Sequence, residues 1–198
     1  MKSTAIIIPT RLQAKRFPSK PLAEINNLPM IVHVVNRAKE SSVGKVVVAT
    51  PDQKIIDVVK KNGGTAVLTK NEHPSGSDRV YEAYLKIFEH EVDLIINLQG
   101  DMPNIKPDSI SKLENLMRKN KCDIGTLSSS IKNKEELDDE NIVKLQVDKD
   151  LKDNDFLDVR DFFRKNNDLN NKKIYHHIGI YAFTNTALKK YVQLARSK

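Results

Sequence analysis

The sequence predicts an α/β fold with a mainly parallel sheet, and three observations lead to this prediction. The first apolar run, residues 5–8 (AIII), has no polar alternation, which is typical of a strand covered by helices on both faces. Residues 30–39 then carry apolar side chains at helical spacing. Residues 45–49 (KVVVA) form a second apolar run, so the three segments together indicate a strand, a helix and a parallel strand.

The same alternation continues along the chain. Apolar side chains at helical spacing predict a helix around residues 55–59, which the run Asn62-Gly63-Gly64 ends. Strands are expected at residues 65–68 and 94–98, with a helix that includes residues 80–87 between them. Further along, we expect a helix over about 107–120, a strand over 122–128 and a helix over about 186–195.

Composition and charge indicate one soluble domain. The chain has 198 residues, of which 39% are hydrophobic and 30% charged, and no apolar run approaches the ~18 residues of a membrane span. The start of the sequence lacks a signal-peptide core and the single Cys122 cannot form an internal disulfide, so we expect a cytoplasmic protein. The net charge of +7 is spread among acidic residues, so we expect a small anionic ligand, no nucleic acid and no membrane.

A basic loop follows the first strand. Pro9 has no backbone donor, so we expect the strand to end there, at the sheet edge where open α/β proteins bind ligands. The cations of this loop are Arg11, Lys15, Arg16 and Lys20. Any one of them could simply be solvated, but Pro18 and Pro21 stiffen the segment around Lys20 and favour a bound phosphate-type ligand. The glycine-rich motifs of P-loop and dinucleotide sites do not occur in the sequence.

Two further corners of this edge carry polar residues. Ser75 or Ser77 can cap the helix that follows, and the amides at its start, beside Arg79, form a second corner suited to an anion. Asp101 follows the strand at residues 94–98 and stands next to a glycine, which lets a ligand approach the backbone. From the residues alone, Asp101 is either a turn former or a ligand for a divalent cation.

Five motifs occur in order along the chain: IIIPTRLQAKRFPSKPL, VATPD, HPSGSDR, LQGDMP and HHIGIYAF. Together they resemble the motifs of the 3-deoxy-manno-octulosonate (Kdo) cytidylyltransferases, and the match covers nearly the whole chain. Departures from the family pattern are Thr10 for alanine, Phe17 for leucine, Ser77 for threonine and Met102 for glutamate. The resemblance implies a Rossmann-like nucleotidyltransferase fold of three layers, with a mainly parallel sheet and a smaller second sheet over the sugar pocket.

The resemblance also implies a reaction. In this family the anomeric hydroxyl of Kdo attacks the α-phosphorus of CTP, which releases pyrophosphate and gives CMP-Kdo for lipopolysaccharide assembly. Arg11 and Lys20 match the cations that bind the triphosphate, and Asp101 matches a ligand of the catalytic Mg²⁺. The substrate positions implied on the nucleotide side are Pro9, Thr10, Arg11, Lys20, Ser75, Arg79 and Gln99.

The second half of the chain corresponds to the sugar side of the family. His177 and Tyr181 match sugar-acid residues, and their spacing puts both on one face of a strand. Arg160 corresponds to an arginine for the sugar carboxylate, although the sequence around it departs from the family's S-R-x-x-I-P pattern. The family also forms a homodimer, which we expect here. The strands expected for the smaller sheet are residues 142–147, 156–159 and 174–183.

The resemblance implies a single nucleotidyltransferase domain over residues 1–198, with a nucleotide half at 1–130 and an incomplete sugar and dimer half at 131–198. The family continues into a G-V-D-T-x-E-D-L motif whose aspartate supplies the other Mg²⁺ carboxylate, whereas this sequence stops at Lys198. We therefore expect weaker Mg²⁺ binding by the chain as written. Three functions stay open: an Mg²⁺-dependent enzyme making CMP-Kdo, a non-catalytic nucleotide-binding fragment or paralogue, and a cytidylyltransferase for another sugar acid.

Overall fold

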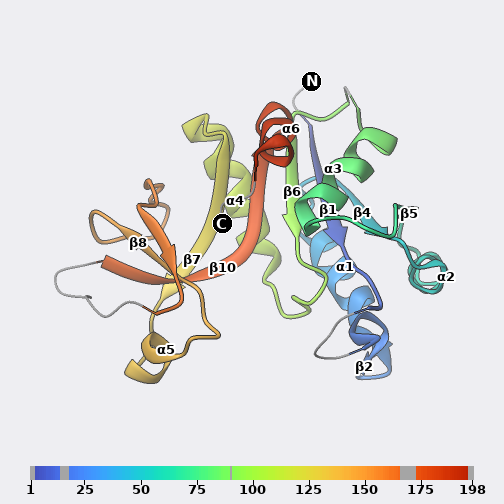
Figure 1. The fold of residues 1–198 in the computed structure, drawn as a ribbon, viewed down its shortest axis with the longest axis horizontal. Coiled ribbons are helices and arrows are strands. Elements are labelled where there is room, and N and C mark those ends of the chain that lie inside the picture. Colours follow the sequence, from blue (N-terminus) through green and yellow to red (C-terminus); the bar gives the residue numbers. More distant parts are fainter. Residues whose placement is uncertain (1–2, 14–17, 90, 166–172, 196–198) are drawn as a thin grey trace. The chain divides into compact units, whose positions relative to one another are not determined.

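The first strand, β1 (Thr4–Pro9), lies at the centre of a parallel arrangement in the computed structural model (Figure 1). The structure describes residues 3–13, 18–89, 91–165 and 173–195. Every residue of β1 is buried, and β1 pairs in parallel with β4 (Lys45–Thr50) on one side and β6 (Leu94–Leu98) on the other. The predicted end of the strand at Pro9 is confirmed.

The chain folds into two compact units. The first contains Met1–Gly125 and Ile180–Lys198, and the second contains Thr126–Gly179. In the first unit the strand order is β5 (Ala66–Leu68), β4, β1, β6 and then β10 (Lys173–Thr184). Only β10 runs antiparallel to its neighbour in this order, so the predicted mainly parallel sheet is confirmed.

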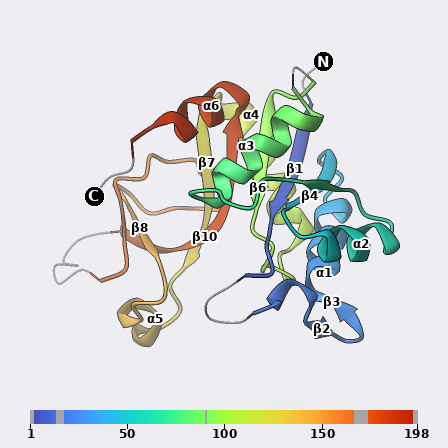
Figure 2. The same cartoon turned by 45° about the vertical axis from the view of Figure 1, so that its right-hand side comes forward.

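Helices cover both faces of this sheet (Figures 1 and 2). The helices α1 (Met30–Glu40), α2 (Gln53–Lys61) and α4 (Pro107–Asn120) pack together on one face. The helices α3 (Gly76–Ile87) and α6 (Asn185–Gln193) pack together on the other. Two layers of helix therefore enclose β1, which explains why its isoleucines do not alternate with polar residues.

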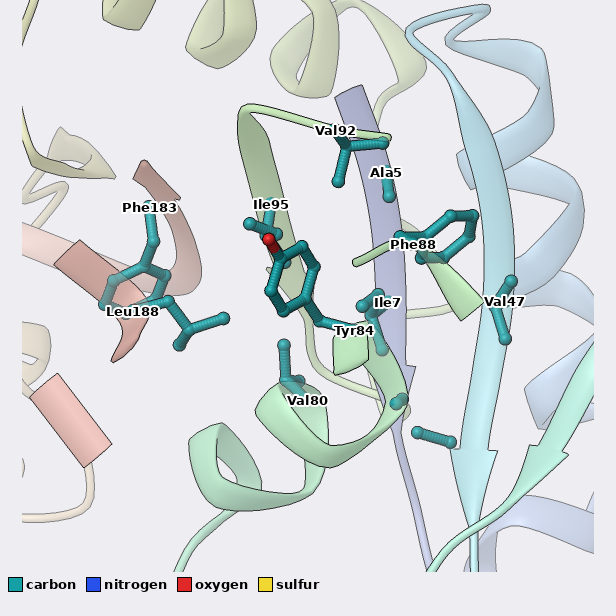
Figure 3. Close-up of a cluster of buried hydrophobic side chains, with 12 residues drawn as sticks. Ala5, Ile7, Val47, Val80, Tyr84, Phe88, Val92, Ile95, Phe183 and Leu188 are labelled. Carbon is teal, nitrogen blue, oxygen red and sulfur yellow. The ribbon is translucent and has the colours of Figure 1, made fainter. Parts of the chain in front are cut away.

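The core on the α3 side fixes that helix against the sheet (Figure 3). Phe88 and Tyr84 pack against Ile7 of β1 and Val47 of β4, and Leu188 of α6 belongs to the same cluster. Each large side chain buried in this way contributes on the order of 1.5–3 kcal/mol. Because the cluster holds the body of α3, it also fixes the first turn of α3 near the carboxyl ends of β1 and β6.

A short excursion connects β1 to α1. It contains a 3₁₀ turn, Lys20–Leu22, and a hairpin of β2 (Glu24–Ile25) and β3 (Leu28–Pro29). Asn26 and Asn27 occupy the two hairpin positions, and both have positive φ, as a two-residue turn of the I′ type requires. This hairpin is not among the elements predicted from the sequence.

The second unit is built on antiparallel pairing. Its strand β8 (Lys144–Val147) pairs with the start of β10 and with β9 (Asp161–Phe163), while β7 (Ile124–Ser130) also pairs with β10. A short helix, α5 (Lys134–Asp138), follows β7. The strand β10 runs through both units and pairs with β6 in the first and with β8 in the second, so these strands belong to one eight-stranded sheet.

One predicted strand is wrong. Residues 156–159 are irregular, and the strand that pairs with β8 begins at Asp161 instead. The Arg160 amide donates to the Gln146 carbonyl (2.8 Å), so the ladder with β8 starts only where the preceding loop reaches that strand. Three of the four residues at 156–159 are apolar, which favoured a strand there, but the partner strand sets where pairing begins.

Candidate active site

A pocket of about 170 Å³ lies at the carboxyl ends of β1 and β6. Its walls come from three places in the sequence: the end of β1, the start of α3 and the residue after β6. The residues that line it are Pro9, Thr10, Arg11, His73, Pro74, Ser75, Gly76, Arg79 and Gln99. Six of them, namely Pro9, Thr10, Arg11, Ser75, Arg79 and Gln99, are residues that the sequence analysis assigned to the nucleotide side.

The backbone after β6 comes unusually close to the backbone after β1. A Cβ atom placed on Gly100 would lie 3.0 Å from the Cβ of Thr10 and 3.2 Å from the Pro9 carbonyl oxygen. Only a glycine fits this approach without displacing a neighbour. Gly100 therefore lets Gln99 and Asp101 flank the end of β1.

The start of α3 is capped by Ser75. Its Oγ accepts a hydrogen bond from the Asp78 amide (3.3 Å) and donates one to Asp78 Oδ2 (2.5 Å). Ser77, the other predicted cap, instead accepts a hydrogen bond from the buried Asn97 side chain of β6 (3.4 Å). The cap turns the chain into α3 at the pocket wall.

Arg79 is buried, with 4% of its surface exposed. Its guanidinium donates to the Thr69 hydroxyl, to the Lys70 carbonyl (2.9 Å) and to the Asn71 carbonyl (3.2 Å). Burial lowers the pKa of Arg79, and the charge of Arg11 lowers it further. Arg79 therefore lines the pocket and at the same time holds the segment 69–71 in place.

Glu82 holds the same segment in place, and it is not among the site residues predicted from the sequence. Its carboxylate accepts from the Lys70 amide (3.0 Å), from Lys86 Nζ (2.7 Å) and from His73 Nε2 (2.5 Å). Burial raises the pKa of Glu82, but hydrogen bonds from Lys86, the Lys70 amide and His73 outweigh burial and hold it at about 2. His73 is thereby fixed in the pocket wall.

In the opposite wall, the described part of the loop after β1 is held through the backbone of Leu12. The Leu12 amide donates to Asp52 Oδ2 (2.8 Å), and the Ser19 amide donates to the Leu12 carbonyl (3.0 Å). Arg11, between the pocket and this contact, is exposed. Lys15 and Arg16, two of the predicted cations, lie outside the described residues.

Lys20 and Asp101 meet as an ion pair. Lys20 Nζ lies 2.8 Å from Asp101 Oδ2, with side chains 40% and 53% exposed. Within the described ranges, no group of three or more histidine, cysteine or acidic side chains is placed to hold a metal ion. A single exposed carboxylate still fits Mg²⁺, which proteins commonly hold through one or two carboxylates together with substrate phosphates.

The roles of Arg160, His177 and Tyr181 in binding the sugar acid stay predictions. On β10, His177 lies in the second unit, where its Nε2 is 3.0 Å from Thr126 Oγ1 and its ring meets the ring of Phe162 edge-on. Burial, and then the charge of His176, lower the pKa of His177. Tyr181 lies in the first unit, packed against the α3 core, and its pKa is raised by burial and then by Tyr191.

Arg160 is engaged by a neighbour at the surface. Its Nε donates to Asp148 Oδ2 (2.7 Å), its Nη2 donates to the same oxygen, and this contact raises the pKa of Arg160. Both side chains are mostly exposed. A sugar carboxylate at Arg160 would have to displace Asp148.

A mainly parallel, three-layer α/β unit with cations and a carboxylate gathered at the carboxyl edge defines a nucleotide-binding enzyme of the nucleotidyltransferase class. A family model described as Cytidylyltransferase matches residues 5–198. A 3-deoxy-manno-octulosonate cytidylyltransferase of Brucella canis is 41% identical over 195 residues, which are 98% of this chain and 77% of the relative. Its counterpart in Rhodopseudomonas palustris is 40% identical, over 98% of this chain and 79% of the relative. The chain belongs to the 3-deoxy-manno-octulosonate cytidylyltransferase family, as its motifs predicted.

Solved structures agree with this assignment. The structure of CMP:2-keto-3-deoxy-manno-octonic acid synthetase complexed with CTP matches with a TM-score of 0.87 and 36% identity, over 99% of this chain and 80% of the other. A cytidylyltransferase of Leptospira borgpetersenii, 18% identical with a TM-score of 0.64, covers 100% of this chain and 66% of the other and shares the fold. Within the described residues, each helix is too short or too polar to cross a membrane.

Proposed function

We propose that this chain transfers CMP from CTP to Kdo and releases pyrophosphate, a step that serves lipopolysaccharide assembly. The observation that carries the proposal is the pocket, because six nucleotide-side positions from distant parts of the sequence line it. Membership of the family supports the choice of Kdo as acceptor. The relative solved with CTP supports the choice of nucleotide.

The reaction is a displacement at phosphorus. The anomeric hydroxyl of Kdo forms a bond to the α-phosphorus of CTP and gives up its proton to solvent, while the bond from that phosphorus to the bridging oxygen of pyrophosphate breaks. The protein contributes positioning and charge stabilisation rather than a nucleophile. Arg11 on the pocket wall and Lys20 bind the triphosphate and offset the negative charge that accumulates on the leaving pyrophosphate.

Asp101 is the residue of this chain that would hold Mg²⁺, together with oxygens of the substrates. When bound, the metal supplies Lewis-acid polarisation of the phosphate oxygens. Lys20 would then give up its ion pair with Asp101 and bind the triphosphate instead. Because the Lys20–Asp101 pair is exposed, it stabilises the fold by at most about 1 kcal/mol, and its exchange costs little.

Pyrophosphate release with CTP, Kdo and Mg²⁺ tests the proposal, against reactions that lack Kdo or metal or contain UTP, GTP or sialic acid. Lys20→Ala and Asp101→Ala should each lower kcat by about 10²–10³-fold with unchanged thermal unfolding. Lys45→Ala is the matched control, because Lys45 also forms an exposed pair, with Glu91 (3.2 Å), at the opposite edge of the sheet. Wild-type turnover in either site variant contradicts the assignment.

The same experiment decides between the remaining functions. A folded chain that binds CTP in calorimetry but releases no pyrophosphate is a nucleotide-binding protein without catalysis. Release that requires a different sugar acid changes the acceptor and keeps the enzyme class. Homodimer formation and a cytoplasmic location stay predictions from the sequence, which light scattering and cell fractionation test.

A further inference from the structure

We propose that Asp52 is a positioning residue that sets Arg11 and Lys20 at the triphosphate site. Asp52 follows β4 and precedes α2, so it lies at the same carboxyl edge of the sheet as the pocket, although it does not line the pocket. The inference rests on the proposed function, since it concerns how the triphosphate cations are held. It assigns to Asp52 a role that the sequence motif around it does not reveal.

The first observation is the direction of the Asp52 side chain. Asp52 is the N-cap residue of α2, where an aspartate normally accepts a hydrogen bond from an amide of its own helix. Here the side chain makes no such cap, and Oδ2 instead accepts from the Leu12 amide at 2.8 Å. Without the cap the first turn of α2 is less stable, and the contact to the basic loop must offset this loss.

The second observation is that this contact brackets Arg11. The Thr10 amide donates to the Ala49 carbonyl of β4 (3.0 Å), and the Leu12 amide donates to Asp52. The backbone is therefore pinned immediately before and immediately after Arg11. Fixing the chain on both sides lowers the entropy that Arg11 loses when it binds an anion.

The third observation links the same contact to Lys20. The Leu12 carbonyl accepts from the Ser19 amide (3.0 Å), and Ser19 adopts a left-handed conformation (φ 58°) as the residue before the 3₁₀ turn. The Ser19 carbonyl accepts from the Leu22 amide (2.9 Å). The Leu12 peptide thus connects Asp52 on one side to the turn that starts at Lys20 on the other.

Asp52 is itself firmly held. Its amide donates to the Oγ1 of the buried Thr50 (3.2 Å), and its carbonyl accepts from the Ile55 amide (3.0 Å) at the start of α2. Its charge also acts on the pocket, because it opposes the lowering of the Arg79 pKa by burial and by Arg11. Together with Glu82, this carboxylate therefore offsets part of the unfavourable environment of the Arg79 charge.

The test compares Asp52→Ala with Asp52→Asn in the full chain. Asparagine keeps an oxygen that accepts from the Leu12 amide and loses the charge, whereas alanine loses both. Asp57→Ala is the matched control, because Asp57 is an exposed carboxylate of α2 whose contact is Gln53 Nε2 (2.8 Å). We expect Asp52→Ala to lower kcat/KM for CTP by about 10–100-fold, with kcat falling more than KM rises, and Asp52→Asn to restore most of it.

Amide hydrogen exchange supplies a readout that needs no nucleotide. The Leu12 and Ser19 amides should exchange faster in Asp52→Ala and near the wild-type rate in Asp52→Asn and Asp57→Ala. Unchanged exchange in Asp52→Ala, or kinetics within twofold of the control, overturns the inference. So does an asparagine variant as impaired as the alanine variant.

Failure of the proposed function is distinguishable from failure of this inference. If the wild type releases no pyrophosphate, the proposed reaction is wrong, and CTP affinity measured by calorimetry then judges Asp52. A lower affinity in Asp52→Ala that Asp52→Asn restores supports positioning. Equal CTP affinity in the wild type and the three variants, or no CTP binding by the wild type, overturns the positioning role of Asp52.

Discussion

The two walls of the pocket both present a cation, but they hold it in different ways. On the α3 wall, Arg79 is buried and donates to three protein oxygens, and Glu82 secures the same segment with three further contacts. On the β1 wall, Arg11 is exposed, and the Asp52 carboxylate accepts a hydrogen bond from the amide of the next residue, Leu12. Burial and the number of protein partners therefore separate a cation that builds the wall from cations that remain accessible to a ligand.

The difference shows that a residue of a sequence motif can serve a site indirectly, by holding the backbone around the pocket in place. The HPSGSDR motif ends in Arg79, whose guanidinium is largely committed to residues 69–71. The first motif contains Arg11 and Lys20, whose partners leave them exposed in whole or in part. Substitutions at four positions test this contrast through the free energy of unfolding, in descending order of expected effect.

Arg79→Ala should have the largest effect, a loss of about 4 kcal/mol in unfolding free energy. The substitution leaves a cavity and removes the donors for the Thr69 hydroxyl and the Lys70 and Asn71 carbonyls. Urea denaturation followed by circular dichroism measures the loss. A variant as stable as the wild type would contradict the structural role of Arg79, because its side chain would then contribute no more to stability than an exposed cation.

Glu82 should make stability depend on pH. Its pKa of about 2 in the fold lies below its ordinary value of 4.5, so its contribution is fully present above 4.5 and disappears as pH falls through about 2. The contribution is on the order of 3 kcal/mol. Denaturation midpoints of wild type and Glu82→Gln should converge as pH falls through this window, and parallel curves would contradict the assignment.

Ser75→Ala should cost about 1 kcal/mol, because the Asp78 amide at the start of α3 loses its cap. Ser75→Thr keeps the hydroxyl and should retain most of that stability. Thermal unfolding of the two variants measures the difference. If alanine and threonine destabilise α3 equally, the cap is not what orders this corner of the pocket.

Arg11→Ala should have the smallest effect on stability, within about 0.5 kcal/mol of the wild type, because the side chain is exposed. Its effect on CTP should be large, since loss of a charge-assisted contact weakens binding by roughly 10–100-fold. Calorimetry with CTP and urea denaturation of the same sample separate the two quantities. A destabilised variant with normal CTP affinity would show that Arg11 supports the fold and does not bind CTP, which contradicts the prediction.

Much of the fold could be predicted because its main signal is local. The uninterrupted apolar run of β1 and the helical spacing in α4 each encode burial in a few neighbouring residues, and both elements were predicted closely. Strand ends meet at one edge of a parallel sheet, so the pocket positions Pro9 to Arg11 and Gln99 could be placed together.

What could not be predicted depends on loop conformation. The contact between Asp52 and Leu12 joins residues forty positions apart through a side chain that would normally cap its own helix. Glu82 has no motif signal, because its role depends on how residues 70–73 fold back over α3. The misplaced strand at 156–159 has the same cause, since pairing with β8 sets the start of β9.

The return of the chain through β10 has a consequence for synthesis on the ribosome. The β6 strand is complete at Leu98, but the segment that covers its open edge, Ile180–Thr184, is made only after the whole second unit has emerged. At about 5–20 residues per second, a nascent chain carries an uncovered apolar strand for several seconds. Leu188 of α6 reaches the α3 cluster later still, so there is a defined interval in which this chain needs protection from aggregation by chaperones.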